Sequence, residues 1–326
     1  MRAAFYEKNG PVRDVLHLDE VDTPQPGPGE VRVRLHTSGV NPSDVKSRLG
    51  TARKIAFPRV IPQSDGAGEI DAVGAGVQQS RIGERVWTWN GQWKRPFGTA
   101  AEYIVLPAAQ AVTLPNSVSF EAGACLGIPA MTASHAVTLA AAAPGKTILI
   151  SGGAGAVSHY AIQFAKQRGA TVVTTISSPD KARIATEAGA DHTIDYKREN
   201  VGERVMALTG NSGADALIEL DLTANAKLIP AVLRPHGTVV IYGTMPEATI
   251  PAAFCLVNSI TLKFFLVYEL SAAEREAVVA EIQRTIGENR LIHNIAKTFP
   301  LAEIFAAHEA VESGRIAGNV VVTIPN

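Results

Sequence analysis

The stretch that decides the fold is residues 147–166, which read Thr-Ile-Leu-Ile-Ser-Gly-Gly-Ala-Gly-Ala-Val-Ser-His-Tyr-Ala-Ile-Gln-Phe-Ala-Lys. It opens with a short apolar run that is typical of a strand, and it continues through a glycine-rich turn into a helical pattern with apolar residues on one face. A strand, a tight glycine turn and a helix form the opening of a dinucleotide-binding βαβ unit. We therefore expect a nucleotide cofactor at this turn.

Small residues at the turn suit this interpretation. Gly153 would permit the sharp turn, and Gly155 would let the backbone approach a pyrophosphate, while the following helix directs its free N–H groups and its dipole at the anion. Serine stands at the third glycine position of G-x-G-x-x-G, at Ser158, so the match to the motif is imperfect. The residues expected to contact the cofactor here are Gly153, Ala154, Gly155, Ala156 and Val157.

Two other interpretations of this stretch fit its residues less well. A glycine-rich turn occurs in other α/β proteins, but a second strand predicted at 171–176 favours the dinucleotide unit. A P-loop also ends in Gly-Lys-Thr, as residues 145–147 do. The P-loop motif needs a glycine at position 140, where this chain has Ala140. It also places its Gly-Lys between strand and helix, whereas here the Gly-Lys precedes the strand.

Composition bounds the class of protein. The 326 residues suggest two domains, and a chain that is 46% hydrophobic and 19% charged can bury a core in each. The net charge is −1 and no lysine/arginine block stands out, which argues against nucleic acid or an anionic membrane as a partner. Cys125 and Cys255 cannot form a disulfide framework, so we expect a reduced, cytoplasmic setting.

No membrane segment or signal peptide is expected. The first ten residues lack the apolar core of a signal peptide. The most apolar long segment, residues 125–143, is interrupted by glycine, proline and polar residues, and it is interpreted as a buried helix.

The pattern changes near residue 120. Before it, strands expected at 30–36, 66–73, 85–89 and 98–106 suggest a small barrel-like domain, and Val31, Val33 and Leu35 point inward. After it, strands and helices alternate, which predicts a parallel, doubly wound α/β sheet. The further strands of that sheet are expected at 171–176, 192–195, 215–220, 238–243 and 260–265.

The end of the chain is expected to return to the first domain. A long amphipathic helix is predicted at 271–288 and a last strand at 319–324. We therefore expect a discontinuous β-rich domain, residues 1–122 with 269–326, around a cofactor-binding domain of residues 123–268.

At this point a set of motifs resembles a known family. In order they are Gly-Val-Asn-Pro-Ser-Asp at 39–44, Pro-Gln-Ser-Asp-Gly-Ala-Gly at 62–68, Gly-Glu-Arg-Val at 83–86, Ala-Glu-Tyr at 101–103 and the nucleotide turn. The chain resembles the medium-chain dehydrogenase/reductase superfamily and, within it, the zeta-crystallin-like quinone oxidoreductase branch. The resemblance implies a Rossmann domain joined to a GroES-like barrel domain, and a homodimer that pairs through the edge strand at 260–265.

The same resemblance bears on metal. Zinc alcohol dehydrogenases carry a cysteine ligand where this chain has Asn41 and a histidine where it has Ser64, and they have a lobe of four cysteines. No cysteine precedes Cys125 here, and zinc needs converging thiolate or imidazole ligands. We therefore expect a zinc-free protein.

Cofactor choice follows from the end of the second strand. An NAD site usually has an acid there for the ribose 2′-OH. This chain has Ser177 instead, with Lys181 and Arg183 close behind, and hydroxyls with a cation suit the 2′-phosphate of NADPH. The alternative is that both cations form the polar face of a helix. The resemblance adds Tyr196 near that phosphate.

Three further residues are expected near the cofactor. Tyr242 and Gly243 end a predicted strand at the carboxyl edge of the sheet, where doubly wound folds bind ligands; a plain strand end is the alternative. Asn319 stands where relatives often have lysine, so a contact there is open.

On the substrate side the resemblance points to Asn41 and Asp44, with Thr132 approaching the nicotinamide. Alternatively, Asn41 is only a turn residue before proline, and the Thr132 hydroxyl only bonds to the backbone of its own helix. Lys46 replaces a tyrosine of the relatives. It could attract an anionic or carbonyl substrate or lie in solvent.

The tryptophans at 87, 89 and 93 could supply the missing flat surface or form a hydrophobic cluster. The sequence therefore predicts an NADPH-dependent, zinc-independent quinone oxidoreductase. The alternatives are an NADPH-dependent enoyl or enone reductase and a non-catalytic NADPH-binding protein.

Overall fold

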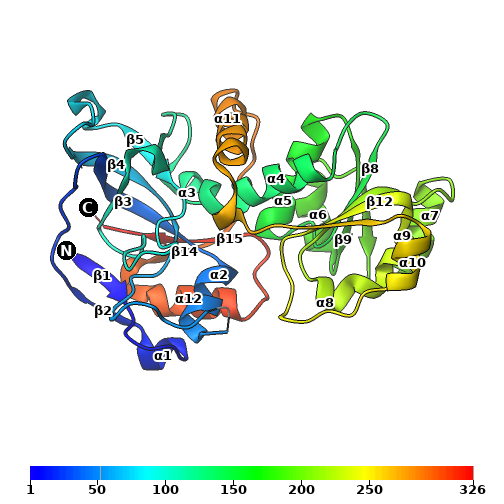
Figure 1. Cartoon of the computed structure of the whole chain (residues 1–326), viewed down its shortest axis with the longest axis horizontal. Helices are drawn as coiled ribbons and strands as arrows, with labels where there is room; N and C mark the ends of the chain where they lie inside the picture. The colour runs from blue at the N-terminus through cyan, green and yellow to red at the C-terminus, as the bar shows by residue number, and fades with distance from the viewer. Residues whose placement is uncertain (52, 326) are drawn as a thin grey trace. The chain divides into compact units, whose positions relative to one another are not determined.

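The computed structural model of the chain describes residues 1–51 and 53–325. The chain divides into two compact units: unit 1 comprises 1–128, 286–289 and 295–326, and unit 2 comprises 129–285 and 290–294. This division assigns residues 269–285 to unit 2, whereas the sequence places them in the first domain; the domain limits 1–122, 123–268 and 269–326 stay a prediction. Figure 1 shows that both chain ends lie in unit 1.

Unit 2 is built on a six-stranded parallel sheet with the order β10-β9-β8-β11-β12-β13. This confirms the predicted doubly wound sheet. The strand order reverses direction between β8 and β11, and such a switch point is where open α/β sheets bind ligands. The strands are β8 (Thr147–Ile150), β9 (Thr171–Ile176), β10 (His192–Asp195), β11 (Ala214–Glu219), β12 (Leu233–Ile241) and β13 (Thr261–Phe264).

Helices accompany every strand of this sheet (Figure 1). On one face a core of buried aliphatic residues joins β8–β12 to α7, α8 and α9, and Val205 and Ile229 are fully buried in it. Strands buried on both faces explain the nearly continuous apolar runs of the sequence. The helices are α4 (Met131–Leu139), α5 (Ala156–Gln167), α6 (Pro179–Glu187), α7 (Val201–Leu208), α8 (Leu222–Asn225), α9 (Ile229–Val232), α10 (Ala252–Val257) and α11 (Ala272–Gly287).

Unit 1 holds a seven-stranded mixed sheet whose path runs β14-β15-β3-β4-β5-β7, with β6 paired to β3. Among the described strands this sheet stays open, so the barrel expected from the sequence does not close. The strands are β3 (Glu30–Val40), β4 (Asp65–Val73), β5 (Arg85–Thr88), β6 (Tyr103–Pro107), β7 (Ala111–Thr113), β14 (Ile295–Pro300) and β15 (Asn319–Thr323). The unit also contains a hairpin-like pair, β1 (Arg2–Phe5) and β2 (His17–Glu20), and the helices α1 (Val12–Val15), α2 (Pro42–Leu49), α3 (Phe120–Gly123) and α12 (Ile304–Glu312).

The alternation in β3 is confirmed, because Val31, Val33 and Leu35 are all buried. The strand predicted at 98–106 is wrong in its first half, since β6 begins at Tyr103. Gly98 lies so close to neighbouring backbone that a Cβ there would be 2.2 Å from the Gln63 carbonyl oxygen, so only glycine fits. The N–H groups of Gly98 and Thr99 donate to the carbonyl oxygens of Ile61 and Gln63, which holds this segment in a loop.

The apolar segment 125–143 is buried, as expected, but it is not one helix. It begins with a π-helical turn over Leu126–Ala130, which contains Pro129, and continues as α4. Proline lacks the N–H that a regular helix needs, which accounts for the irregular turn. In the described part of the chain no helix is long and apolar enough to span a membrane.

Candidate functional site

The glycine-rich turn connects β8 to α5 at the carboxyl edge of the unit 2 sheet. Gly152 has a φ of 67° and is therefore in the left-handed region. The sharp turn was expected one residue later, at Gly153. Gly153 is required for a different reason: a Cβ there would lie 2.4 Å from the Thr174 Oγ1 atom and 3.1 Å from the Ala185 Cβ atom. Glycine at 153 therefore lets the turn pack onto β9 and α6.

The turn leaves room for a ligand on its other side. A Cβ on Gly155 would meet only the Gly152 carbonyl oxygen, at 3.2 Å. Gly155 is the N-cap residue of α5, and Ala156 and Val157, both half-buried, form its first turn. The N–H groups of a first helical turn have no acceptor within the helix, and they carry the positive end of the helix dipole. A twelve-residue helix that begins in this way can bind a phosphate.

Ser158, at the imperfect position of the motif, has a structural use. It is 1% exposed, and its hydroxyl donates to the Ser151 carbonyl oxygen at 2.7 Å. The Tyr242 hydroxyl lies 3.2 Å from the Ser158 Oγ atom, and burial raises the pKa of Tyr242 above its usual range. A serine therefore ties α5 to the end of β8 where glycine would only permit close packing.

Gly243 also has a steric role at this edge. A Cβ there would lie 1.9 Å from the Leu220 carbonyl oxygen, so the chain after β12 can pass the end of β11 only as glycine. This places Tyr242 and Gly243 at the carboxyl edge of the sheet, beside the glycine-rich turn.

Glu219 is a buried residue of this edge that the sequence analysis missed. It is fully buried, and it accepts from the Ser151 hydroxyl at 2.6 Å, from the Asp221 N–H at 2.7 Å and from the Asn225 amide at 2.9 Å. Three donors satisfy the carboxyl group and hold the end of β8 against β11. The only signal in the sequence was a glutamate at the end of an apolar strand.

The proposed 2′-phosphate residues gather at the ends of β9 and β10. The Lys181 Nζ atom donates to the Ser177 hydroxyl at 3.1 Å. Tyr196 follows β10, is 53% exposed, and donates its N–H to the Ile176 carbonyl oxygen. Arg183 does not join them, because it pairs with Glu187 one turn along α6 at 2.8 Å.

The substrate-side residues of unit 1 lie at the start of α2. Asn41 is the N-cap residue; its N–H donates to Asp44 Oδ2 at 2.8 Å, and its side-chain amide donates to Asp65 Oδ2 at 2.7 Å. Asn41 and Asp44 are each 5% exposed. Burial raises the pKa of Asp44 to about 7 and the pKa of Asp65 well above its usual range. Asp65 is a second residue that the sequence analysis did not single out.

The other predicted site residues are more scattered. Lys46 is exposed on α2, Thr132 is 4% exposed near the start of α4 in unit 2, and Asn319 is 5% exposed at the start of β15 in unit 1. Two of the tryptophans have different surroundings. Trp87 is fully buried in β5, whereas the Arg53 guanidinium stacks over the ring of Trp93.

The residues at the catalytic zinc positions of related alcohol dehydrogenases do not suit zinc. The Asn41 amide is used as a donor to Asp65, and the Ser64 hydroxyl accepts from the Gln92 N–H at 3.3 Å. Neither is a thiolate or imidazole. Across residues 1–51 and 53–325, no group of three or more His, Cys, Asp or Glu side chains stands close enough to hold a metal ion.

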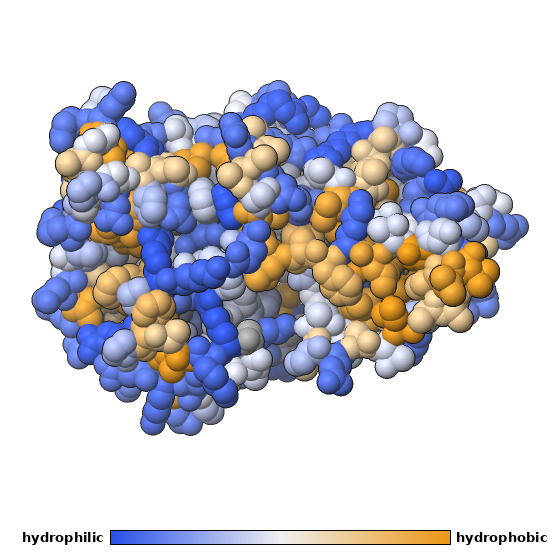
Figure 2. Space-filling view, in the orientation of Figure 1, coloured by the Kyte–Doolittle hydropathy of each residue, from blue (hydrophilic) through white to orange (hydrophobic). Residues whose placement is uncertain are grey.

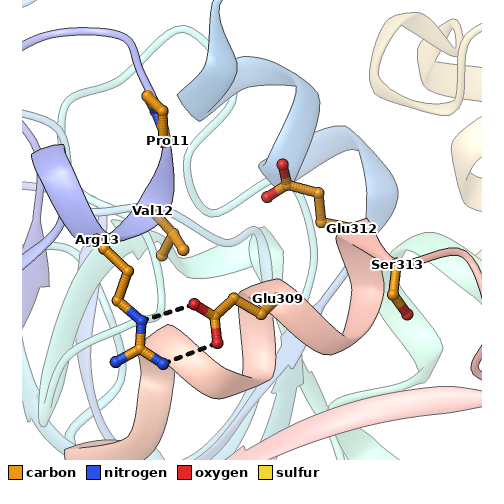
Figure 3. A pocket seen from close by; sticks show the side chains of 6 residues that line it. All are labelled: Pro11, Val12, Arg13, Glu309, Glu312 and Ser313. Carbon is orange, nitrogen blue, oxygen red and sulfur yellow. Dashed lines mark hydrogen bonds and ion pairs between the residues drawn. The ribbon is translucent and has the colours of Figure 1, made fainter.

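A cavity of about 380 Å³ lies elsewhere in unit 1, between α1 and α12 (Figure 3). Figure 3 shows Arg13 directed at Glu309, and their two hydrogen bonds measure 2.6 and 2.8 Å. None of the lining residues belongs to the predicted site. The charges there are already paired, Arg13 with Glu309 and Glu312 with Arg48 at 2.6 Å. The cavity is lined by Pro11, Val12, Arg13, Glu309, Glu312 and Ser313.

Comparison with known proteins agrees with this architecture. Residues 27–116 match the model of the alcohol dehydrogenase GroES-like domain, and residues 156–284 match that of the zinc-binding dehydrogenase. A quinone oxidoreductase of Pseudomonas aeruginosa is 30% identical over 98% of both chains. A 2-haloacrylate reductase of a Burkholderia species is 28% identical over 99% of this chain and 98% of its own.

Solved structures give the same result. A quinone oxidoreductase of Pseudomonas syringae superposes with a TM-score of 0.89 at 27% identity over 99% of both chains. A mycobacterial protein solved in complex with NADPH superposes with a TM-score of 0.88 at 26% identity, also over 99% of both. The chain therefore belongs to the quinone oxidoreductase family of the medium-chain dehydrogenase/reductase superfamily, a family of enzymes.

Proposed function

We propose that this protein is an NADPH-dependent oxidoreductase that transfers a hydride from the nicotinamide to a quinone without zinc. The observation that carries the proposal is the edge of the unit 2 sheet, where the glycine-rich turn meets Ser177 and Lys181. A relative solved with NADPH and relatives named quinone oxidoreductase support it.

Residues of unit 2 would hold the cofactor. The first turn of α5 binds the pyrophosphate through backbone N–H groups, with Gly155 giving it access. The 2′-phosphate binds to Ser177, Lys181 and Tyr196, since a hydroxyl and a cation are suitable partners for it. The one carboxylate between Ser177 and Lys181 is that of Asp180, in the first turn of α6. When bound, NADPH supplies the hydride and is oxidised to NADP⁺.

The reaction needs little further chemistry from the protein. A quinone is electron-poor and takes up the hydride and one proton to give the hydroquinone. The protein must orient the acceptor and exclude water. Asn41 keeps a second amide N–H beyond the one used by Asp65, which can donate to an acceptor oxygen. Thr132 is proposed to contact the nicotinamide.

Zinc independence forms part of the proposal, although one matching family model is named for zinc-binding dehydrogenases. The amide and hydroxyl at positions 41 and 64 are poor zinc ligands, and both already have hydrogen-bond partners. Activity that survives dialysis against a chelator, with less than one zinc per ten chains by elemental analysis, would support it. Loss of activity that added zinc restores would overturn it.

An alkene reductase is the second candidate. The hydride step is the same, and a relative named 2-haloacrylate reductase favours it over the third candidate, a non-catalytic NADPH-binding protein. Asn41 and Asp44 would then face the carbonyl of a conjugated alkene.

A homodimer is also proposed. β13 is an edge strand of the sheet, and the adjoining helix α10 presents exposed apolar side chains, with Leu256 at 82% and Val257 at 81% exposed. Phe264 on β13 is 61% exposed, and Figure 2 shows apolar residues gathered over the α10 end of unit 2. Large apolar patches of this kind mark interaction sites.

The test of function is oxidation of NADPH followed at 340 nm with a benzoquinone, an ortho-quinone and an α,β-unsaturated ketone, and repeated with NADH. Rapid quinone-dependent loss with NADPH is expected. Turnover of the ketone alone would select the alkene reductase. NADPH binding without turnover of any acceptor would select the non-catalytic reading.

A further inference from the structure

Arg53 lies half-buried in unit 1 on a platform made by Trp93 and Gln92. Its guanidinium carbon is 4.7 Å from the centroid of the Trp93 ring, and its Nη2 atom donates to Gln92 Oε1. Gln92 is itself fixed: it is 6% exposed, and its amide donates to the Arg95 carbonyl oxygen at 2.9 Å. The guanidinium is therefore held in one orientation before any ligand arrives.

Arg53 differs from other arginines that stack on aromatic rings in this unit. Arg85 lies over the Phe120 ring at 4.3 Å, and its guanidinium donates to three oxygen atoms, those of the Pro115 and Val118 carbonyls and of the Asn116 side chain. Arg59 lies over the Phe5 ring at 4.2 Å and pairs with Glu7 at 2.9 Å. Arg13 and Arg32 likewise stack on rings and pair with carboxylates, Glu309 and Asp71. Within the described part of the chain, Arg53 has only the neutral Gln92 oxygen as a partner, so most of its N–H donors remain available.

Asp44, whose carboxyl group is within electrostatic reach of Arg53, balances its charge only in part. The charge of Arg53 favours the ionised form of Asp44, but burial is the larger effect and raises the pKa of Asp44 to about 7. The Asp44 carboxyl accepts from the Asn41 N–H instead. Arg53 also acts on Tyr6, whose pKa burial raises to about 12. An incompletely balanced cation thus lies within electrostatic reach of Asp44, one of the two residues proposed to face the acceptor. Its partner Gln92 also donates its N–H to the Ser64 hydroxyl at 3.3 Å, and Ser64 precedes Asp65, which accepts from Asn41.

We propose that Arg53 binds a carboxylate of the acceptor, so that the preferred substrate is a conjugated acceptor that carries an acid group. This inference rests on the second candidate under the proposed function, the alkene reductase, and deepens it. A planar guanidinium forms two parallel hydrogen bonds to a carboxylate, and stacking on Trp93 leaves its edge free for them. In such an acceptor one carbon of the double bond takes the hydride and the other a proton from solvent, while NADPH becomes NADP⁺.

A matched pair of acceptors tests the inference. 4-Oxo-4-phenylbut-2-enoate and its methyl ester share the same alkene and differ in charge. The wild-type enzyme is expected to have the higher kcat/KM with the acid. Arg53→Gln is expected to lower that value about 10- to 100-fold, the range for a charged hydrogen bond, and to leave the ester within about twofold. Arg53→Lys keeps the charge without the planar fork and should fall between the two.

The control variant is Arg59→Gln, which removes an equally stacked arginine that already has a carboxylate partner. It should change neither substrate by more than about twofold. Melting temperatures show that each variant is folded. Equal turnover of acid and ester by the wild type, or equal losses for both in Arg53→Gln, would overturn the inference while leaving the proposed function intact.

A binding measurement separates the two ideas if nothing turns over. The saturated acid, 4-oxo-4-phenylbutanoate, and its methyl ester are titrated by calorimetry in the presence of NADPH. Tighter binding of the acid, lost in Arg53→Gln but kept in Arg59→Gln, supports the site even when the proposed reaction fails. Acid and ester that bind alike, or no binding of either, refute it.

Discussion

The glycines of the turn are expected to separate packing from cofactor binding. In Gly153→Ala the new methyl group would lie 2.4 Å from Thr174 Oγ1 and 2.7 Å from Thr174 Cγ2, both well inside contact distance. In Gly155→Ala the nearest atom would be the Gly152 carbonyl oxygen at 3.2 Å, and Gly155 has a φ of −72°, which alanine adopts readily. The first change should therefore damage the fold and the second the cofactor site.

The magnitudes follow from these contacts. Overpacking of a buried position costs about 1–3 kcal/mol, because β9 and α6 must move to relieve the contact. For a chain of this size that corresponds to a melting temperature lowered by roughly 1.5–4.5 °C in Gly153→Ala. Gly155→Ala should melt within about 2 °C of the wild type, but its methyl group occupies the approach to the first turn of α5 and should weaken NADPH binding about tenfold or more.

The assay pairs differential scanning fluorimetry of the free protein with NADPH titration by fluorescence. Gly287→Ala, at the end of α11, serves as a control for glycine replacement, since no heavy atom lies within 4 Å of its Cβ position and its φ is not in the left-handed region. Gly155→Ala that melts far below the wild type, or that binds NADPH normally, would refute the assignment of Gly155 to the cofactor. Gly153→Ala with unchanged melting would show that the steric argument is wrong.

Three further outcomes are expected. Lys181→Ala should raise the KM for NADPH about tenfold and leave the KM for NADH unchanged, because the lysine contacts only the 2′-phosphate, which NADH lacks. Equal effects on both cofactors would contradict this role. Burial lowers the pKa of His159 and His293 to about 4 in the folded state. In the unfolded chain these two histidines bind more protons below pH 6.5, so their contribution to stability is complete above that pH and falls by about 1.4 kcal/mol per pH unit for each histidine down to about pH 4. Asp44 and Asp65, whose pKa values burial raises, act in the opposite direction over the same range. Urea unfolding of the wild type beside a His159→Gln/His293→Gln variant isolates the histidine contribution, and equal pH slopes for the two proteins would exclude this linkage. Phe264→Glu with Leu256→Glu should convert a dimer to a monomer in light scattering, and a wild-type monomer at micromolar concentration would contradict the dimer.

Part of the fold was readable because it depends on local pattern. The bounds of β9 and β10 match their predicted ranges, since short apolar runs between turn residues leave little choice of structure. The open form of the unit 1 sheet and the loop at Gly98 were not readable, because they depend on which backbones meet across the sheet.

The candidate site divides in the same way. The sequence by itself determined the dinucleotide unit, because the glycine-rich turn, its strand and its helix are contiguous and each follows from residue type. Only the tertiary structure decided that Glu219 secures Ser151, and that Arg53 lacks the carboxylate partner that Arg59 has. These contacts join residues that are tens of positions apart in the chain, and hydrogen bonding and burial depend on the folded environment, which residue spacing does not specify.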